Sequence, residues 1–306
     1  GFADGVNSGT NAVFLALAAL ELPAGSEVVI PPITDPGGSS PVAILNCIPV
    51  QADSAPGMYN MGPEQLEAVI TEHTRAVVVA HIAGMPVDMD GIMAVARKHK
   101  LPVVEDCAQA HGARLTGRLV GTFGDMASFS TMFGKHMVTG GQGGVVYTRN
   151  EDLHWRGKRY ADRGKPFNLQ GTTNVVPALN MNMDELSAAI GREQLKKLPG
   201  IVARRREIAA AIRDGISALR PVSIMREAPG TESSYWFLPV HVDTTALAVA
   251  KDAFADVVAA EGIPTMKSYR HIPAELAWFR NHADAPTPWL YRGRLNANPD
   301  LANVTA

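Results

Sequence analysis

The sequence has few cysteines, no long apolar run and no excess of charge of either sign. Its 306 residues include two cysteines, Cys47 and Cys107, and none of the CxxC or Cys/His spacings that hold zinc. It contains no run of about 18 apolar residues and no secretory signal. The 28 basic and 30 acidic residues leave a formal net charge of -2, so we expect neither nucleic acid nor an anionic membrane as a partner. We predict a cytoplasmic protein without a metal site or a membrane span.

What is present is an alternation of short β-branched runs with helical patterns. Strands are predicted at residues 27–30, 49–53, 75–81, 101–106, 127–130 and 144–148, and helices at 11–20, 63–71, 88–100 and 184–198. Several of these strands are almost continuously apolar, which is typical of strands covered on both faces. The sequence therefore predicts a mainly parallel sheet between two layers of helices, with ligands bound beyond the carboxyl ends of the strands. The basic segment 150–165 is either a solvated helix face or an anion contact.

The chain is predicted to divide into a large and a small domain. Residues 1–199 would form the large domain, and Pro199-Gly200 would end the helix over 184–198. Residues 200–306 would form a smaller α+β domain. Its predicted elements are helices at 201–219 and 246–261 and a half-buried strand at 234–243. Because the chain begins without methionine and ends in the polar segment NANPDLANVTA, we expect an N-terminal lead-in and a C-terminal portion to be missing.

The segment Asp125 to Gly144, DMASFSTMFGKHMVTGGQGG, combines a lysine with a cluster of glycines. It predicts a short strand, a loop that carries Lys135, and then a glycine-rich loop. Glycines allow positive φ angles and the close approach of a flat ligand. A lysine held beside them can become a nucleophilic amine that forms a Schiff base, and Ser130 would place a hydroxyl near the same ligand. The alternative is a surface lysine in a mobile hairpin.

Two further segments could hold the other ends of such a ligand. Gly9 and Thr10 stand at the start of an Ala/Leu-rich helix, where backbone N–H groups and the helix dipole favour an anion; a plain capped helix is the alternative. Asp106 stands at the carboxyl end of the buried strand LPVVED and could pair with a cationic ring nitrogen, or it could cap a helix. His111, in the sequence CAQAHGA, is either a structural or a catalytic histidine.

Together these segments provide a phosphate-binding helix start, an acid for a ring nitrogen and a Schiff-base lysine. Pyridoxal phosphate (PLP) needs these three groups. The chain resembles the fold-type I, PLP-dependent sugar aminotransferases typified by DegT and StrS. The resemblance is carried, in the family's order, by the segments NSGTNAVFLALAAL, GSEVVIPP, AHIAGMPVDMDGI, VVEDCAQAHGA, GTFGDMASFSTMFGKHMVTGGQGG, LNMNMDELSAAIGREQLKKL and SYWFLPVHVD.

The resemblance implies a three-layer αβα large domain around a mostly parallel sheet, a smaller α+β C-terminal domain, and a homodimer with active sites at its interface. Lys135 would be the Schiff-base lysine, and Asp106 would pair with the pyridine nitrogen. The remaining implied roles are Gln109 near the ring hydroxyl, Gly9, Thr10 and Ser130 on the phosphate, and Asn180 on the phosphate of the other subunit's cofactor.

The implied activity is transfer of an amino group from glutamate or glutamine to a keto sugar nucleotide or a keto-cyclitol, as in surface-glycan or antibiotic biosynthesis. A sugar dehydratase of the same family would have histidine in place of the lysine. Here Lys135 is kept, and His136 follows it on the opposite side of an extended segment. A non-catalytic PLP-binding regulatory protein is a further alternative.

Three positions depart from the family pattern. The aromatic residue that stacks on the cofactor ring is absent from Ile33-Thr34-Asp35-Pro36, Gln142 replaces a carboxylate, and Asn182 replaces an arginine. These departures bear on the substrate, whereas Lys135 and Asp106 are intact.

Overall fold

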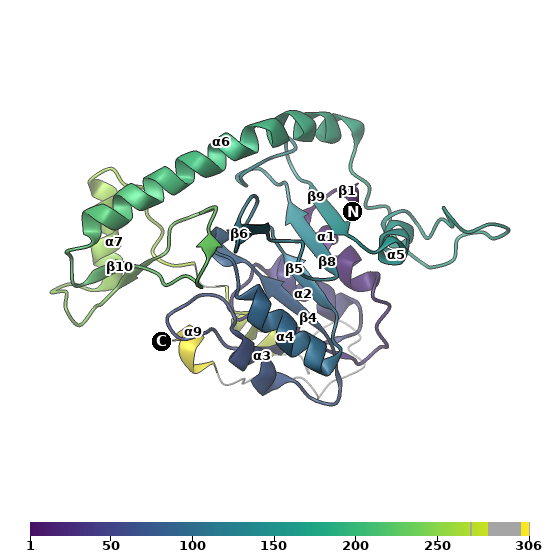
Figure 1. Ribbon diagram of the computed structural model, residues 1–306, viewed down its shortest axis with the longest axis horizontal. Coiled ribbons are helices and arrows are strands. Elements are labelled where there is room, and N and C mark those ends of the chain that lie inside the picture. Colours follow the sequence, from purple (N-terminus) through teal and green to yellow (C-terminus); the bar gives the residue numbers. More distant parts are fainter. Residues whose placement is uncertain (270, 281–300, 306) are drawn as a thin grey trace.

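The computed structural model describes residues 1–269, 271–280 and 301–305. Its centre is a seven-stranded sheet with the order β1-β9-β8-β5-β4-β2-β3 (Figure 1). The strands are β1 (Phe2–Val6), β2 (Glu27–Ile30), β3 (Ile48–Gln51), β4 (Thr74–Ala80), β5 (Val103–Asp106), β8 (Met126–Ser130) and β9 (Gly144–Thr148). The strands from β8 to β3 are parallel, and β9 is antiparallel to both β8 and β1. The predicted mostly parallel sheet is therefore confirmed.

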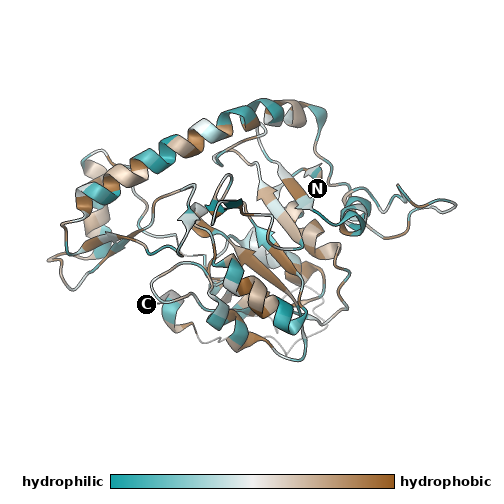
Figure 2. Ribbon diagram, in the orientation of Figure 1, coloured by the Kyte–Doolittle hydropathy of each residue, from teal (hydrophilic) through white to brown (hydrophobic). Residues whose placement is uncertain are grey.

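Helices cover both faces of this sheet, because alternate strand residues point to opposite sides. On one face lie α1 (Gly9–Ala18), α2 (Pro36–Ile44) and α5 (Glu151–Ala161), and on the other lie α3 (Pro63–Val69) and α4 (Met89–His99). In β4, Val78 packs in the core of the first face and Val77 and Val79 pack in the core of the second. Figure 2 shows the apolar residues concentrated in the central strands. The three-layer αβα architecture is confirmed.

The predicted strands, and the predicted helices at 11–20, 63–71 and 88–100, lie within two residues of the observed ones, but the structure adds β1, α2 and the short strands β6 (Arg114–Leu115) and β7 (Arg118–Leu119). The strand β1 has no counterpart among the predicted strands, since FADGV lacks a β-branched run. It forms because it pairs along its whole length with β9. By contrast, the signals of α4 are local: the Asp88 carboxylate accepts the Gly91 N–H at 3.1 Å, and Lys100 closes the helix with a left-handed φ of 56°.

The helix predicted to end at Pro199-Gly200 continues, so this prediction is wrong. α6 (Glu185–Ile216) is one helix of 32 residues, the long ribbon at the top of Figure 1. Proline removes one helical N–H, but buried residues lie on both sides of it: Gly191 before, and Val202 and Ala209 after. The boundary between residues 199 and 200 falls inside this helix, and the division into two domains stays a prediction. α6, like every other helix in the described ranges, is too polar or too short to cross a membrane.

The region after α6 contains short elements that pack partly on the large domain. They are β10 (Val222–Ile224), β11 (Thr231–Glu232), β12 (Val240–Val242), α7 (Lys251–Ala260), the 3-10 helix η2 (Pro273–Glu275), α8 (Ala277–Arg280) and α9 (Ala302–Thr305). β10 pairs with β12, whereas β11 joins β6 (Arg114–Leu115) and β7 (Arg118–Leu119) in a small sheet. The helix predicted at 246–261 is observed as α7 and begins later than predicted.

The strand predicted over 234–243 is wrong for most of its length, since only β12 is a strand there. Tyr235 has a left-handed φ of 47°, which interrupts an extended run. The backbone N–H groups of Ser234 and Trp236 donate to carbonyls of the 3-10 helix η1 (Ile82–Gly84). These backbone hydrogen bonds hold residues 234–236 against the segment after β4 and not in a strand.

Candidate active site

A cavity of about 310 Å³ opens at the carboxyl ends of the parallel strands, where ligands bind in sheets of this kind. Residues that follow β2, β4, β5 and β8 line it, together with the first turn of α1. The predicted site residues in its wall are Gly9, Thr10, Asp106, Gln109, Ser130 and Lys135. The structure thus brings all the predicted site residues except Asn180 into one cavity, and their roles there stay predictions.

Asn180 lies outside this wall. It is exposed, forms a β-bridge with Asp162, and accepts the Asn182 N–H at 3.2 Å. Two large apolar side chains nearby in the sequence are also exposed, Leu179 by 70% and Leu186 by 72%. Asn180 is therefore placed on a surface that a second subunit could cover.

Two glycines line the cavity at positions where a side chain would collide with its neighbours. A Cβ atom on Gly9 would lie 2.5 Å from Cβ of Ser130, and one on Gly38 would lie 3.2 Å from Oδ2 of Asp106. Ser8 caps α1 through its hydroxyl, and Ser8, Gly9 and Thr10 line the cavity, so the start of this helix stands at the cavity edge. A helix start beside glycines that leave room for a ligand suits an anion such as a phosphate.

Asp106 ends β5 and turns its carboxylate toward the cavity. The group is buried, and its Oδ1 accepts the Ala108 N–H at 3.0 Å. Burial raises the pKa of Asp106, while the Ala108 N–H and the Lys135 charge act in the opposite direction. A buried carboxylate is stabilised by a cationic partner, so a protonated ring nitrogen fits this position.

Lys135 is half-buried in the loop after β8. Burial lowers the pKa of its amine, while the charges of Asp106 and Asp35 oppose this change. A lower pKa increases the fraction of neutral, nucleophilic amine. The Nζ atom lies 3.8 Å from the centroid of the Trp236 ring. These properties suit a lysine that forms a Schiff base.

Asp35 stands in the segment where the family has its ring-stacking aromatic, and it lines the cavity. Its Oδ1 accepts the Gly37 N–H at 3.0 Å and so caps α2. Aromatic side chains reach the Lys135 loop from the region after α6 instead. Trp236 and Tyr269 meet there edge to face with their ring centroids 6.0 Å apart.

Gln109 connects this aromatic pair to the cavity. Its Nε2 donates to the Tyr269 hydroxyl at 2.7 Å, and its Oε1 accepts the Ala83 N–H at 2.8 Å. Neither Trp236 nor Tyr269 is among the predicted site residues. Their signal is two short aromatic segments, SYWF and SYR, and nothing in either spacing indicates that they meet beside Lys135.

Glu105, next to Asp106 in β5, is a second buried carboxylate that is also not among the predicted site residues. Its Oε1 accepts the N–H groups of Phe123 and Gly124 at 2.7 and 2.6 Å, and its Oε2 accepts the Gly121 N–H at 2.7 Å. Desolvation is the largest single influence and favours the neutral acid, but His81 and the backbone N–H groups together lower the pKa of Glu105. Glu105 is therefore an ionised anchor inside the protein.

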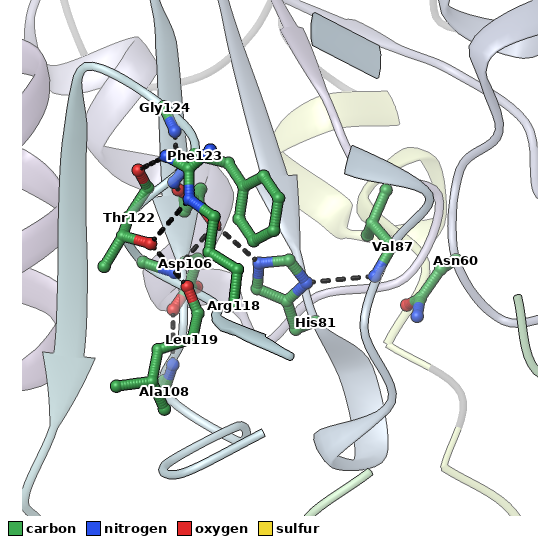
Figure 3. Close-up of polar contacts among 12 residues, drawn as sticks. Asn60, His81, Val87, Asp106, Ala108, Arg118, Leu119, Thr122, Phe123 and Gly124 are labelled. Carbon is green, nitrogen blue, oxygen red and sulfur yellow. Dashed lines mark hydrogen bonds and ion pairs between the residues drawn. The ribbon is translucent and has the colours of Figure 1, made fainter. Parts of the chain in front are cut away.

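His81 completes this network with one defined tautomer. Its Nδ1 accepts the Val87 N–H at 3.0 Å, so Nε2 carries the proton and donates to Glu105 at 3.2 Å. Figure 3 shows the His81 ring between Val87 and the loop that carries Phe123 and Gly124.

The sulfur of Cys107 lies within 4.8 Å of ligand atoms of His81 and Glu105, which makes the cluster a candidate metal site. The ligand atoms of His81 and Glu105 are already hydrogen-bonded, which favours a structural network. The His81 backbone N–H also donates to the Asp106 carbonyl at 3.1 Å, so the network joins β4 to β5 and holds Asp106 at the cavity.

His111 and His136 lie behind the cavity wall. Their ring centroids are 5.6 Å apart, and Nε2 of His136 is 3.0 Å from the Ser234 carbonyl oxygen. Burial lowers the pKa of His111 to about 3 and that of His136 to about 4, so both are neutral at pH 7. Their position indicates a structural role. The Lys135–His136 segment is a bend, not the extended segment that was predicted, and His136 is not part of the cavity wall.

The cavity fits PLP on its own chemistry. The helix start and the glycine wall suit a phosphate, the buried Asp106 suits a cationic ring nitrogen, and the half-buried Lys135 suits an aldehyde.

Comparison with known sequences identifies a family that matches most of the chain. A profile of the DegT/DnrJ/EryC1/StrS aminotransferase family matches residues 1–288. GDP-perosamine synthase of Escherichia coli O157:H7 is 34% identical over 239 residues, which are 78% of this chain and 65% of that protein. L-glutamine:scyllo-inosose aminotransferase of Streptomyces griseus is 34% identical over 278 residues, which are 87% of this chain and 65% of that protein. The chain thus spans 65% of the length of these two curated relatives.

Solved structures agree as well. An aminotransferase from Psychrobacter cryohalolentis has a TM-score of 0.84 at 34% identity, covering 96% of this chain and 78% of its own. E. coli GDP-4-keto-6-deoxy-D-mannose-3-dehydratase with bound hydrated PLP has a TM-score of 0.79 at 25% identity, covering 86% of this chain and 72% of its own. Both support the αβα fold, and the second places a protein with bound PLP among the structural neighbours.

Proposed function

The chain belongs to the DegT/DnrJ/EryC1/StrS aminotransferase family, and from that premise we propose that it acts as a PLP-dependent aminotransferase on keto sugars. The observation that carries the proposal is the position of Lys135 and Asp106 in the wall of one cavity at the carboxyl edge of the sheet. A nucleophilic amine and a buried acid in one cavity, together with a helix start for the phosphate, are the groups that this chemistry requires.

Each end of the cofactor has a proposed holder. When bound, PLP supplies an aldehyde that exchanges amines and a ring that withdraws electrons from the carbon losing a proton. Lys135 would hold the aldehyde end and Asp106 the ring nitrogen, while the first turn of α1 and Ser130 would hold the phosphate. An ionised Asp106 would keep the ring nitrogen protonated, because opposite charges at close range favour both charged forms.

Lys135 is also the proposed acid and base. After the amino donor has displaced it, its Nζ would take the proton from the donor's Cα. In the second half-reaction the same amine would deliver a proton to the former carbonyl carbon of the acceptor. The lowered pKa of Lys135 supports this role, since the amine can then accept a proton closer to neutral pH. Two successive half-reactions predict ping-pong kinetics.

Glutamate or glutamine is the proposed donor, and a keto sugar nucleotide or a keto-cyclitol is the proposed acceptor. The names of the two relatives support these classes: one is a GDP-perosamine synthase, and the other uses L-glutamine and scyllo-inosose. Asp35 gives the cavity wall a polar group where the family has an aromatic, so Asp35 is a proposed contact to a hydroxylated or amine-bearing substrate.

A homodimer is the proposed assembly. Asn180 lies outside its own cavity on a surface with exposed Leu179 and Leu186, and such apolar surface is typical of an interface. Phe133, two residues before Lys135, is also 66% exposed. In the proposed dimer, Asn180 reaches the phosphate site of the partner subunit, and each active site is composite.

A sugar dehydratase is the second candidate, because the E. coli dehydratase shares the fold. Lys135 at the cavity and His136 behind it favour amino transfer, since a dehydratase of this family would carry histidine at the lysine position. A non-catalytic regulatory protein would bind PLP through Lys135 without turning over a substrate.

The proposal is tested by trapping the cofactor. Borohydride reduction of the PLP-loaded protein, followed by peptide mass spectrometry, should place the label on Lys135. Lys135→Ala should lose it, and the matched control Lys158→Ala should keep it. A label on Lys158 or Lys267 would overturn the assignment.

Substrate panels separate the candidate activities. With glutamate or glutamine as donor, keto sugar nucleotides and inososes should include an acceptor that gains an amine. Water loss from a keto sugar without amine transfer would favour the dehydratase, and labelling without any turnover would favour the regulatory protein.

A further inference from the structure

Trp236 covers Lys135 from a distant part of the chain. The Lys135 Nζ lies 3.8 Å from the indole centroid, inside the range of roughly 6 Å over which an ammonium is attracted to an aromatic face. Neither the predicted site residues nor the proposed mechanism assigns Trp236 a role.

The indole is held in place by contacts that do not involve Lys135. Its Nε1–H donates to the Gly134 carbonyl at 2.8 Å, and its backbone N–H donates to the Ala83 carbonyl at 2.8 Å. Arg205 of α6 donates to the Trp236 carbonyl at 3.0 Å, and Tyr269 packs edge-on against the ring. A lysine side chain has many rotamers, so a fixed aromatic face favours the one that keeps the amine at the cavity.

Four titratable groups surround Lys135. They are Asp106 at the end of β5, Asp35 at the start of α2, and His111 and His136 behind the cavity. The two carboxylates favour the ammonium, whereas burial favours the neutral amine. The histidines are neutral at pH 7, because burial lowers their pKa values to about 3 and about 4. The Trp236 face attracts only the ammonium, so it acts in the same direction as the carboxylates.

We propose that Trp236 is a positioning residue for Lys135: its indole face holds the free ammonium at the cavity wall. The importance of this contact in turnover rests on the proposed function, in which Lys135 is released in each half-reaction and must stay near the donor's Cα. The contact itself needs no cofactor, so it is measurable in the chain without PLP.

The test is the titration of Lys135 in the cofactor-free protein. Lysines are reductively methylated with ¹³C-formaldehyde, which keeps their charge, and the Lys135 resonance is assigned by its loss in Lys135→Arg. Trp236→Leu keeps an apolar cover but removes the aromatic face, and Trp236→Phe keeps a smaller aromatic face. Trp155→Leu in α5 is the matched control, since Trp155 donates to Glu151 and α5 packs against α1, β1 and β9.

We expect Trp236→Leu to lower the pKa of Lys135 by about one unit, a tenfold change in its protonation equilibrium. Trp236→Phe should lower it by less, and Trp155→Leu should leave it unchanged. An unchanged or raised pKa in Trp236→Leu would overturn the proposal, because the ring would then act only by excluding water. Should circular dichroism show that Trp236→Leu is unfolded, Trp236→Phe decides, and an unchanged titration there overturns the proposal equally.

The outcome is separable from that of the proposed function. An unshifted titration with borohydride label still on Lys135 refutes the positioning role and leaves the aminotransferase in place. A shifted titration without borohydride label at Lys135 supports the positioning role and refutes the proposed role of Lys135 in holding PLP. In the loaded enzyme, Trp236→Leu should lower kcat more than it raises KM for the donor, since it acts on the lysine after the donor has bound.

Discussion

Replacing Glu105 by glutamine tests the buried network beneath Asp106. Glu105 accepts hydrogen bonds from three backbone N–H groups and from His81. Glutamine keeps one acceptor oxygen and adds an NH₂ group, which turns two of these contacts into donor–donor contacts in either orientation. His81 offers no relief, because its other nitrogen already accepts the Val87 N–H.

The expected loss of stability follows from the two buried donors that are left without an acceptor. Each buried donor left without an acceptor costs about 1–3 kcal/mol, so Glu105→Gln should lower the free energy of unfolding by about 2–6 kcal/mol. That is a large part of the stability of about 5–15 kcal/mol that is typical of a folded protein. The matched control is Glu67→Gln on the surface, where the pair with Lys98 and His99 is partly exposed. An exposed pair of this kind contributes little to stability, because water and salt screen it.

Urea unfolding followed by circular dichroism measures both variants. The pH dependence gives a second check with a defined sign. The folded-state pKa of Glu105 is lowered, so its contribution is present above the ordinary glutamate pKa of about 4.3 and is lost as the pH falls through the lower folded-state value. The difference between parent and Glu105→Gln should persist at neutral pH and shrink only in that acidic range. A Glu105→Gln protein as stable as Glu67→Gln at pH 7 would refute the count of unsatisfied donors.

Three further predictions concern the cavity. Asp106→Asn should retain some PLP but lose turnover by roughly 10²-fold or more, as expected for a lost charge-assisted pair at the reacting ring; near-parental kcat would show that the ring nitrogen needs no carboxylate. Asp35→Phe should tighten PLP binding in an absorbance titration, since stacking contributes about 0.5–1.5 kcal/mol beyond area. An unchanged Kd would place this segment away from the ring, and lost activity with retained PLP would assign Asp35 to the substrate. Equal amounts of Lys135→Ala and Asn180→Asp subunits, exchanged in a two-fold dimer, should regain about a quarter of parental activity; no recovery despite tag-confirmed exchange would defeat the shared site.

Local sequence patterns were sufficient to predict most of the strands and helices in residues 1–199. β2 and β9 occur at the predicted bounds, because an apolar β-branched run between turn residues has few ways to bury itself other than as a strand. α4 carries both of its end signals within its own sequence. Lys135 and Asp106 could be expected at the cavity because one follows a predicted strand and the other ends one, at the edge where parallel sheets bind ligands.

Contacts between distant residues decided the rest. In sequence, Glu105 and Asp106 are two adjacent acids, and only the alternation of β5 and the loop at 121–124 send one into a hydrogen-bond network and the other to the cavity. A proline ends most helices. α6 nevertheless continues through Pro199, because buried residues flank it on both sides.

Trp236 shows the same limit at the site itself. Its own segment predicts a strand, and its place over Lys135 depends on backbone bonds to η1 and on Arg205 from α6. The sequence by itself determined which residue types stand at strand ends and helix starts, since those choices depend on neighbours in the chain. The tertiary structure decided which donor meets which acceptor, because that depends on how the chain returns to the same edge of the sheet.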